Sequence, residues 1–250
     1  MSSLKSYIAG LELEEIGSHS KFPSISFISD SIYESNGESG AVINYRNLQS
    51  FAEGLEAQQK EDAMNSMLIA QRAATKSYPD ESQLKQWHQK YFEVLTRLGW
   101  TINQKDFKKY ITDDQNIEIE KVLLEIIGAT LTANQVALIT KAIDALRKLG
   151  SDDSRFVAFE RNTQDGHAGN FQVELISGAN GTVSITSSSL HIKSTDRMTR
   201  ILFFKTSREK IMIEYGTMQA TLDESVYSTA RSDVKMKLGD TSSYLAQLEI

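Results

Sequence analysis

The sequence predicts an α+β fold, with a mainly helical region at residues 1–150 and an antiparallel β meander or sandwich at 151–250 that is closed by a helix at 223–239. Two observations predict this fold. Before Gly150 the apolar residues recur with the helical period of about 3.6, whereas after it they alternate as in strands. Because the short apolar runs follow one another through turn residues, we expect neighbouring strands to pair antiparallel.

The helical region begins with Leu4, Ile8 and Leu11 on one face, which predicts a short helix that ends near Gly17. Residues 18–40 are rich in serine and predict a loop with a short strand inside it. Helices are expected over most of 48–150, with a less regular stretch around 100–113.

The clearest helix is the one at 132–149. Thr132 is its expected N-cap and Gln135, three residues on, its capping-box partner, while Gly150 follows its end. After this glycine the runs FVAFE, FQVEL, TVSIT, LHIKS, RILFFK, KIMIEY and MQATL predict short strands. Asp223 and Gly239 then bound the closing helix.

The strongest hairpin signal is Asn180-Gly181, inside SGANG at 177–181. Apolar and polar residues alternate on both sides of this turn, but the alternation fails at Ser187 and Ser189. The sequence therefore predicts an ordinary surface hairpin with arms of five or six residues, shorter than the 9–11 residues of a membrane-spanning strand.

Composition excludes several function classes. The net charge is −6, and both halves of the chain are mildly acidic, so nucleic-acid binding is not expected. The chain has no cysteine, which rules out disulfides and thiolate chemistry. Its first residues lack the apolar core of a Sec signal peptide, so we expect a protein that is cytoplasmic as synthesised, or exported without such a signal.

We find no motif for a catalytic residue, a cofactor or a metal, and the four histidines are scattered along the chain. Only the loop at 164–170 gathers chemistry-bearing residues, namely Asp165, His167 and Asn170, in which a carboxylate could orient a general base. The competing interpretation is a hairpin loop that is rich in turn-forming residues, and it is the one we favour.

Three function classes remain open, and the ranking among them rests on elimination. The favoured hypothesis is a non-enzymatic toxin or effector that binds a protein or membrane surface, through rearrangement of its helices, with self-association into a homo-oligomer left open. The alternative is a cytoplasmic interaction or assembly protein. The third class is an enzyme whose site lies around the 164–170 loop.

Overall fold

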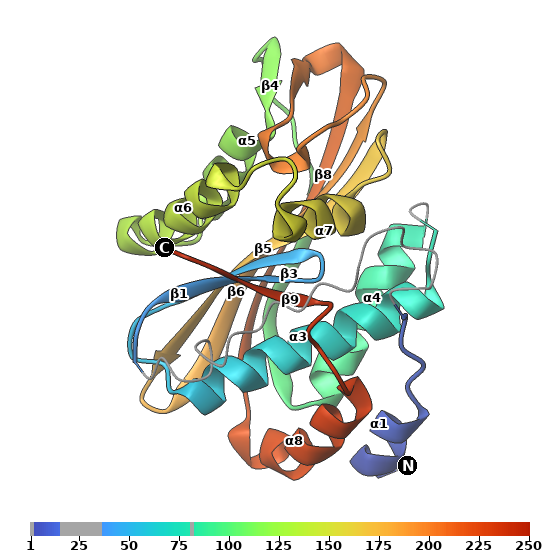
Figure 1. The fold of residues 1–250 in the computed structure, drawn as a ribbon, viewed down its shortest axis with the longest axis vertical. Helices are drawn as coiled ribbons and strands as arrows, with labels where there is room; N and C mark the ends of the chain where they lie inside the picture. Colours follow the sequence, from blue (N-terminus) through green and yellow to red (C-terminus); the bar gives the residue numbers. More distant parts are fainter. Residues whose placement is uncertain (1–2, 16–36, 81–82) are drawn as a thin grey trace.

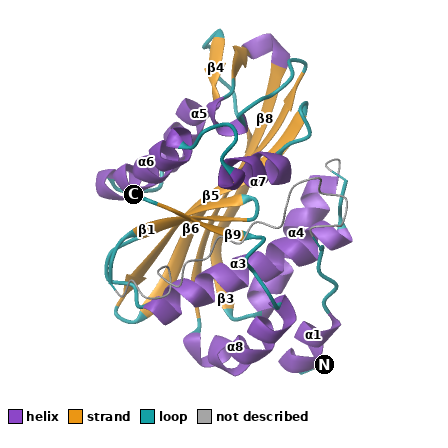
Figure 2. Ribbon diagram, in the orientation of Figure 1, coloured by secondary structure: helices purple, strands orange, loops and turns teal. Residues whose placement is uncertain are grey.

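The computed structural model describes residues 3–15, 37–80 and 83–250, and most of the loop predicted at 18–40 lies outside them. A seven-stranded sheet forms the middle of three layers (Figures 1 and 2). Helices α1 (Leu4–Gly10), α3 (Ala57–Ser77), α4 (Leu84–Arg97) and α8 (Glu224–Leu238) cover one face, and α5 (Ile119–Gly128), α6 (Ala133–Lys148) and α7 (Ser154–Thr163) cover the other. The predicted α+β class is confirmed.

The sheet is mixed and draws strands from the whole chain. Its order is β3-β8-β6-β5-β2-β1-β9. The strands are β1 (Gly40–Asn44), β2 (Asn47–Phe51), β3 (Trp100–Lys109), β5 (Ala168–Ala179), β6 (Thr182–Ser194), β8 (Ile211–Leu222) and β9 (Leu245–Leu248), with β4 (Asn116–Glu118) and β7 (Lys205–Ser207) paired separately.

Three features differ from the predicted arrangement. The β2–β5 pair is parallel, so the sheet is not a purely antiparallel meander. Strands β1, β2 and β3 precede residue 150 yet join the same sheet as β5, β6 and β8, so the sheet is not confined to 151–250. Strand β2 also replaces the start of the helix expected at 48, because both of its faces are covered and all five of its residues are buried.

Two predicted strands are absent. The run FVAFE belongs to helix α7, because Phe156 and Phe159 share a buried helical face and the Asp153 side chain caps the first turn by accepting from Arg155 N. The run RILFFK holds a 3₁₀ turn at Ile201–Phe203, which follows Arg200 in a left-handed conformation. Runs of five or six residues fit both the helical and the strand period. The Asp153 cap favours the helix in the first run, and the left-handed Arg200 precedes the 3₁₀ turn in the second.

The predicted helix boundaries at the capped ends are confirmed. Thr132 and Gln135 form the expected capping box at the start of α6. The Asp223 side chain accepts from Ser225 N and Val226 N at the start of α8, and Gly239, with a φ of 63°, follows its end. These boundaries depend on local hydrogen bonds, which is why the sequence predicts them well.

The hairpin turn is confirmed, but its predicted length and its surface location are wrong. Asn180 and Gly181 have φ values of 52° and 79°, and a type I′ hairpin turn requires a positive φ at both positions. The arms β5 and β6 hold 12 and 13 residues and form the centre of the sheet. They are longer than the 9–11 residues that cross a bilayer, so length does not exclude them from a membrane role.

Candidate functional site

The 164–170 loop is held together by backbone hydrogen bonds. Asp165 Oδ1 accepts from His167 N at 2.9 Å and from Ala168 N at 2.7 Å, and these bonds lower the pKa of the Asp165 carboxyl. The His167 ring nitrogen Nδ1 lies 3.3 Å from the Ser194 carbonyl. Asn170 is buried in β5, on the row of the sheet opposite His191. The carboxylate serves as a turn former, which favours the structural interpretation of this loop.

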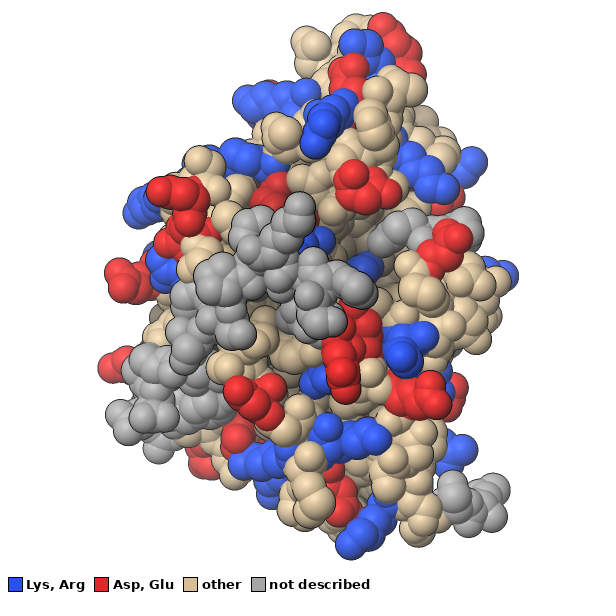
Figure 3. All heavy atoms as spheres, turned by 45° about the vertical axis from the view of Figure 1, so that its right-hand side comes forward, with Lys and Arg blue, Asp and Glu red and all other residues tan. Residues whose placement is uncertain are grey.

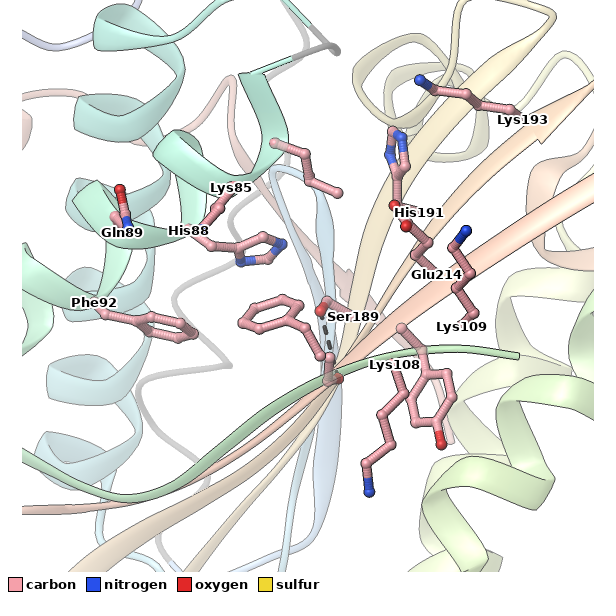
Figure 4. Close-up of a pocket in the computed structure, with 14 residues that line it drawn as sticks. Lys85, His88, Gln89, Phe92, Lys108, Lys109, Ser189, His191, Lys193 and Glu214 are labelled. Atoms are coloured by element: carbon pink, nitrogen blue, oxygen red, sulfur yellow. Dashed lines mark hydrogen bonds between the residues drawn. The ribbon is translucent and has the colours of Figure 1, made fainter. Parts of the chain in front are cut away.

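A larger feature lies between α4 and the sheet, where the structure contains a cavity of about 570 Å³. We call it the α4 groove. Figure 4 shows side chains from α4 facing side chains from β3, β6 and β8 across it. The residues that line it are Leu84, Lys85, His88, Gln89, Phe92, Phe107, Lys108, Lys109, Ser189, His191, Lys193, Glu214, Tyr215 and Gly216.

Strand register arranges the floor of the groove in rows. Ser189 lies opposite Gly216, and Gly216 lies opposite Phe107. The next row holds His191, Glu214 and Lys109. Because residues two apart on a strand share a face, both rows point toward α4. At Gly216 an added Cβ would lie 2.5 Å from the Phe107 ring, so the glycine lets that ring lie close to the floor.

Aromatic rings from α4 and β3 surround one imidazole beside the groove. His88 lies 4.8 Å from Phe107, 5.9 Å from Phe92 and 5.0 Å from Trp87, measured between ring centroids. Only 4% of His88 is exposed, and its Nδ1 has no hydrogen-bond partner among the described residues. Burial, aided by the nearby His191, lowers the His88 pKa to about 3, so the imidazole is neutral.

The mouth of the groove is cationic and partly apolar. Lys85, Lys109 and Lys193 are exposed around it. Phe107 is 51% exposed, and Met212, which pairs with Lys193 on the same face, is 44% exposed. On the face that Figure 3 shows, charges of both signs are interspersed. Apolar side chains beside lysines suit a contact with an anionic, partly apolar partner.

Deeper in the same interface the sheet carries a buried polar seam under α3 and α4. We define this seam as the side chains of Asn44, Asn47, Gln49, Gln172, Glu174 and Ser187, all of which are buried. Glu174 is its centre: Gln49 Nε2 donates to Oε2 at 2.7 Å, and Tyr91 of α4 donates to Oε1 at 3.3 Å. Burial raises the Glu174 pKa to about 7, against the opposing effect of these hydrogen bonds.

Nothing in the sequence relates His88 to His191, yet the fold places both of them in the groove. His88 and His191 are far apart in the chain but close enough for His191 to affect the His88 pKa. The sequence offers only the alternation of Lys109 with Phe107, and of Lys193 with His191, at the ends of strands. Each pattern by itself describes an ordinary solvated strand end, so neither indicates a groove.

Within the described ranges, no three His, Asp or Glu side chains are placed to hold a metal ion. Among those same residues, the helices are all too short or too polar to cross a membrane. The hydroxyl of Ser189, which lies in the groove beside both histidines, is 3.4 Å from the Gly216 carbonyl and donates to it. This bond directs its proton toward the backbone rather than toward a general base.

Comparisons with known proteins found likenesses of fold. No family model matches the chain, and no curated protein matches its sequence. Similar solved structures include activated Cyt2Ba from Bacillus thuringiensis subsp. israelensis (14% identity, TM-score 0.35, 54% of this chain and 78% of that one), a delta-endotoxin (11%, 0.43, 72% and 81%) and the Evf virulence factor (10%, 0.36, 84% and 87%). Likenesses of this degree describe an arrangement of helices and strands and say nothing about activity.

Proposed function

We propose that the protein is a non-enzymatic, toxin- or effector-like protein that acts by binding a target membrane surface through the mouth of the α4 groove. The observation that carries this proposal is the combination of exposed Lys85, Lys109 and Lys193 with the exposed Phe107 and Met212. Lysines attract the anionic headgroups of a bilayer, at about 1 kcal/mol for each lysine near the surface. Exposed apolar side chains gain further free energy by entering the interface between headgroups and acyl chains.

The buried polar seam supports a rearrangement of the helices after binding. Asn44 Nδ2 donates to the Met64 carbonyl of α3 at 3.0 Å, and Tyr91 of α4 donates to Glu174. When these polar side chains are exposed to water, they replace their lost hydrogen bonds with bonds to water. Exposing apolar surface to water instead costs about 25 cal/mol per Å². Lifting α3 and α4 from the sheet is therefore less costly along the seam than along an apolar interface.

Co-sedimentation with vesicles tests the binding step. We expect the protein to bind vesicles that contain phosphatidylglycerol and to be released by salt, because the lysine contribution is screened. The double variant Lys109→Glu/Lys193→Glu should lose this binding. Lys141→Glu/Lys148→Glu, which makes the same charge change on exposed residues of α6 across the sheet, should keep it. Equal binding by both double variants would refute the proposal.

Dye release from the same vesicles tests the rearrangement. A disulfide engineered between α3 and β1, which meet at Met64 and Asn44, should block release until it is reduced. Because the chain has no cysteine of its own, the engineered pair is the only one that can form. A matched disulfide across the β5–β6 hairpin, beside 177–181, is the control and should leave release unchanged. Release that persists with α3 clamped would contradict the helix rearrangement and leave the binding step standing.

A further inference from the structure

The α4 groove has the size and composition of a ligand site. Its volume of about 570 Å³ falls in the range of roughly 300–1,000 Å³ that small-molecule sites occupy. Such sites combine apolar walls with a few polar groups that fix orientation. Here Leu84, Phe92 and Phe107 supply the walls, and the histidines, lysines and Glu214 supply the polar groups.

His88 is the observation that indicates a bound partner. Its residue is 96% buried, its ring points into the groove, and its Nδ1 lacks a hydrogen bond among the described residues. A buried polar atom without a partner disfavours the folded state. Ser50 Oγ and Trp100 Nε1 also lack a partner among the described residues, and His88 differs from them because it lines the groove. A neutral imidazole has one donor and one acceptor nitrogen, so a hydroxyl or an ester oxygen can satisfy Nδ1. Because Nδ1 is itself buried, a lipid oxygen reaches it only after a neighbouring side chain, such as the half-exposed Phe107 that packs on the imidazole, moves aside.

The charges around the mouth select an anion. Lys85 comes from α4, Lys109 from β3 and Lys193 from β6, and Lys108 lies at the outer edge. Glu214 of β8 is the acidic side chain among the residues that line the groove. The cations outnumber it and come from three different elements, so they surround an anionic group on several sides.

The exposed apolar residues distinguish a lipid from a free anion. Phe107 and Met212 lie beside the lysines, at 51% and 44% exposure. A soluble phosphate would leave both side chains in water, whereas a lipid that stays anchored in its bilayer brings glycerol and acyl carbons against them. The occupant that covers all of these groups is amphipathic.

We propose that the α4 groove binds the headgroup and glycerol region of one anionic phospholipid, with the phosphate between Lys109, Lys193 and Lys85 and a polar oxygen of the lipid on His88 Nδ1. This inference rests on the proposed membrane binding and specifies its site. The acyl chains remain outside, beside Phe107 and Met212. Binding is then one lipid to one protein, and it requires a particular headgroup rather than negative charge alone.

A soluble short-chain lipid tests the site without a membrane. Dihexanoyl phosphatidylglycerol, kept below its micelle concentration, should bind the full chain at one to one by isothermal titration calorimetry. Dihexanoyl phosphatidylcholine and inorganic phosphate should bind at least about tenfold more weakly, a difference of about 1.4 kcal/mol. Inorganic phosphate that binds as tightly as the anionic lipid would overturn the proposal, since the groove would then be a site for free anions.

Replacement of His88 tests the residue itself. His88→Phe should weaken binding of the short-chain anionic lipid about fivefold to tenfold, the effect of one lost hydrogen bond. It should leave the melting temperature equal or higher, because it removes an unpartnered polar atom. His88→Asn, which keeps a polar group near the position of Nδ1, should recover part of the affinity. His167→Phe, outside the groove, is the control, and an equal loss of affinity in it would refute the assignment.

Comparison with vesicles separates the two proposals. Vesicles containing phosphatidylglycerol that bind while the soluble lipid does not would overturn the lipid site and leave membrane binding intact. Binding of the soluble lipid without binding of vesicles would support the site and overturn the proposed function. The lysine double variant Lys109→Glu/Lys193→Glu keeps the inference testable should His88→Phe fail to fold, since both lysines are exposed. It should lose binding of the soluble lipid as well.

Discussion

Gln49 donates from Nε2 to Glu174 Oε2 at 2.7 Å, and the two residues lie directly opposite one another on the parallel strands β2 and β5. Neither side chain is exposed. Gln49 also accepts through Oε1 from Asn44 Nδ2 at 2.9 Å, so a chain of hydrogen bonds runs from β1 to the centre of the sheet. An ionisable group at the end of a buried chain makes stability depend on pH.

Glu174→Gln should change that dependence in a defined direction. Burial raises the folded-state pKa of Glu174 from 4.5 to about 7, so the folded protein holds a proton that the unfolded chain has lost. The contribution of Glu174 is therefore full below about pH 4.5 and is lost as the pH rises toward 7, at about 1.4 kcal/mol per pH unit. The difference in unfolding free energy between variant and wild type, from urea denaturation, should shift in favour of the variant across this window. A difference that is constant with pH would show that Glu174 does not titrate there.

His88→Phe should remove a dependence of the opposite sign. Burial lowers the His88 pKa from 6.5 to about 3, so below pH 6.5 the unfolded chain takes up a proton that the folded protein refuses. Wild-type stability from this group falls as the pH drops from 6.5 toward 3, and the variant should not show this fall. Between about pH 4.5 and 6.5 the contributions of His88 and Glu174 to the unfolding free energy change with pH in opposite directions, and they largely cancel in the wild type. The unfolding free energy should therefore rise with pH in Glu174→Gln and fall with pH in His88→Phe. If the unfolding free energies of both variants change with pH in the same direction, the pKa shifts given for His88 and Glu174 are wrong.

Arg231→Met should destabilise the protein by about 3–5 kcal/mol, because it leaves a buried carboxylate without its partner. Arg231 of α8 binds Asp62 of α3 in a fork, with Nη2 2.7 Å from Oδ2 and Nε 2.9 Å from Oδ1. The Asp62 side chain is only 2% exposed. In a double-mutant cycle, Asp62→Asn combined with Arg231→Met should cost much less than the sum of the single variants. Additive losses would mean that the pair does not couple α3 to α8.

Gly181→Ala should cost about 1–2 kcal/mol through backbone conformation alone. Gly181 has a φ of 79°, and an added Cβ would meet no atom within 4 Å. Gly128 in α5 offers a matched control, since its added Cβ also meets nothing but its backbone is helical. Gly128→Ala should stabilise the protein by about 0.5–1 kcal/mol. Thermal denaturation of the two variants checks this, and shifts of the same sign would show that the turn does not require a positive φ.

Asp165→Ala should lower stability by about 1 kcal/mol, because it removes the acceptor of two backbone N–H groups. His167→Ala should leave both stability and vesicle binding near those of the wild type. Unfolding and co-sedimentation of the two variants measure these effects. A hundredfold loss of biological activity in a folded His167→Ala variant would instead support the hypothesis that the 164–170 loop is a catalytic site.

The sequence by itself determined the features that depend on neighbours in the chain. The capping box of Thr132 and Gln135, the Asp223 cap and the Asn180-Gly181 turn each involve residues within a few positions, so their chemistry is visible in the sequence. It also determined the class, because helical and strand periods are both present. Where a run was as short as FVAFE, the two periods coincided and the prediction of a strand failed.

Only the tertiary structure decided what covers each face. Gln172 and Glu174 alternate with apolar residues, and Ser187 and Ser189 interrupt the apolar face of the return strand, as on a solvated hairpin. All four lie on the face that α3 and α4 cover, where they are buried and hydrogen-bonded. The pattern of polar and apolar residues does not show whether a polar face contacts water or another part of the protein. The sequence therefore predicted a surface hairpin where the structure has a central one. The α4 groove likewise exists because β3, β6 and β8 meet α4 through pairings between residues as distant as 107 and 216. Residues so far apart in the chain are brought together by the whole fold, and their spacing in the sequence does not show it.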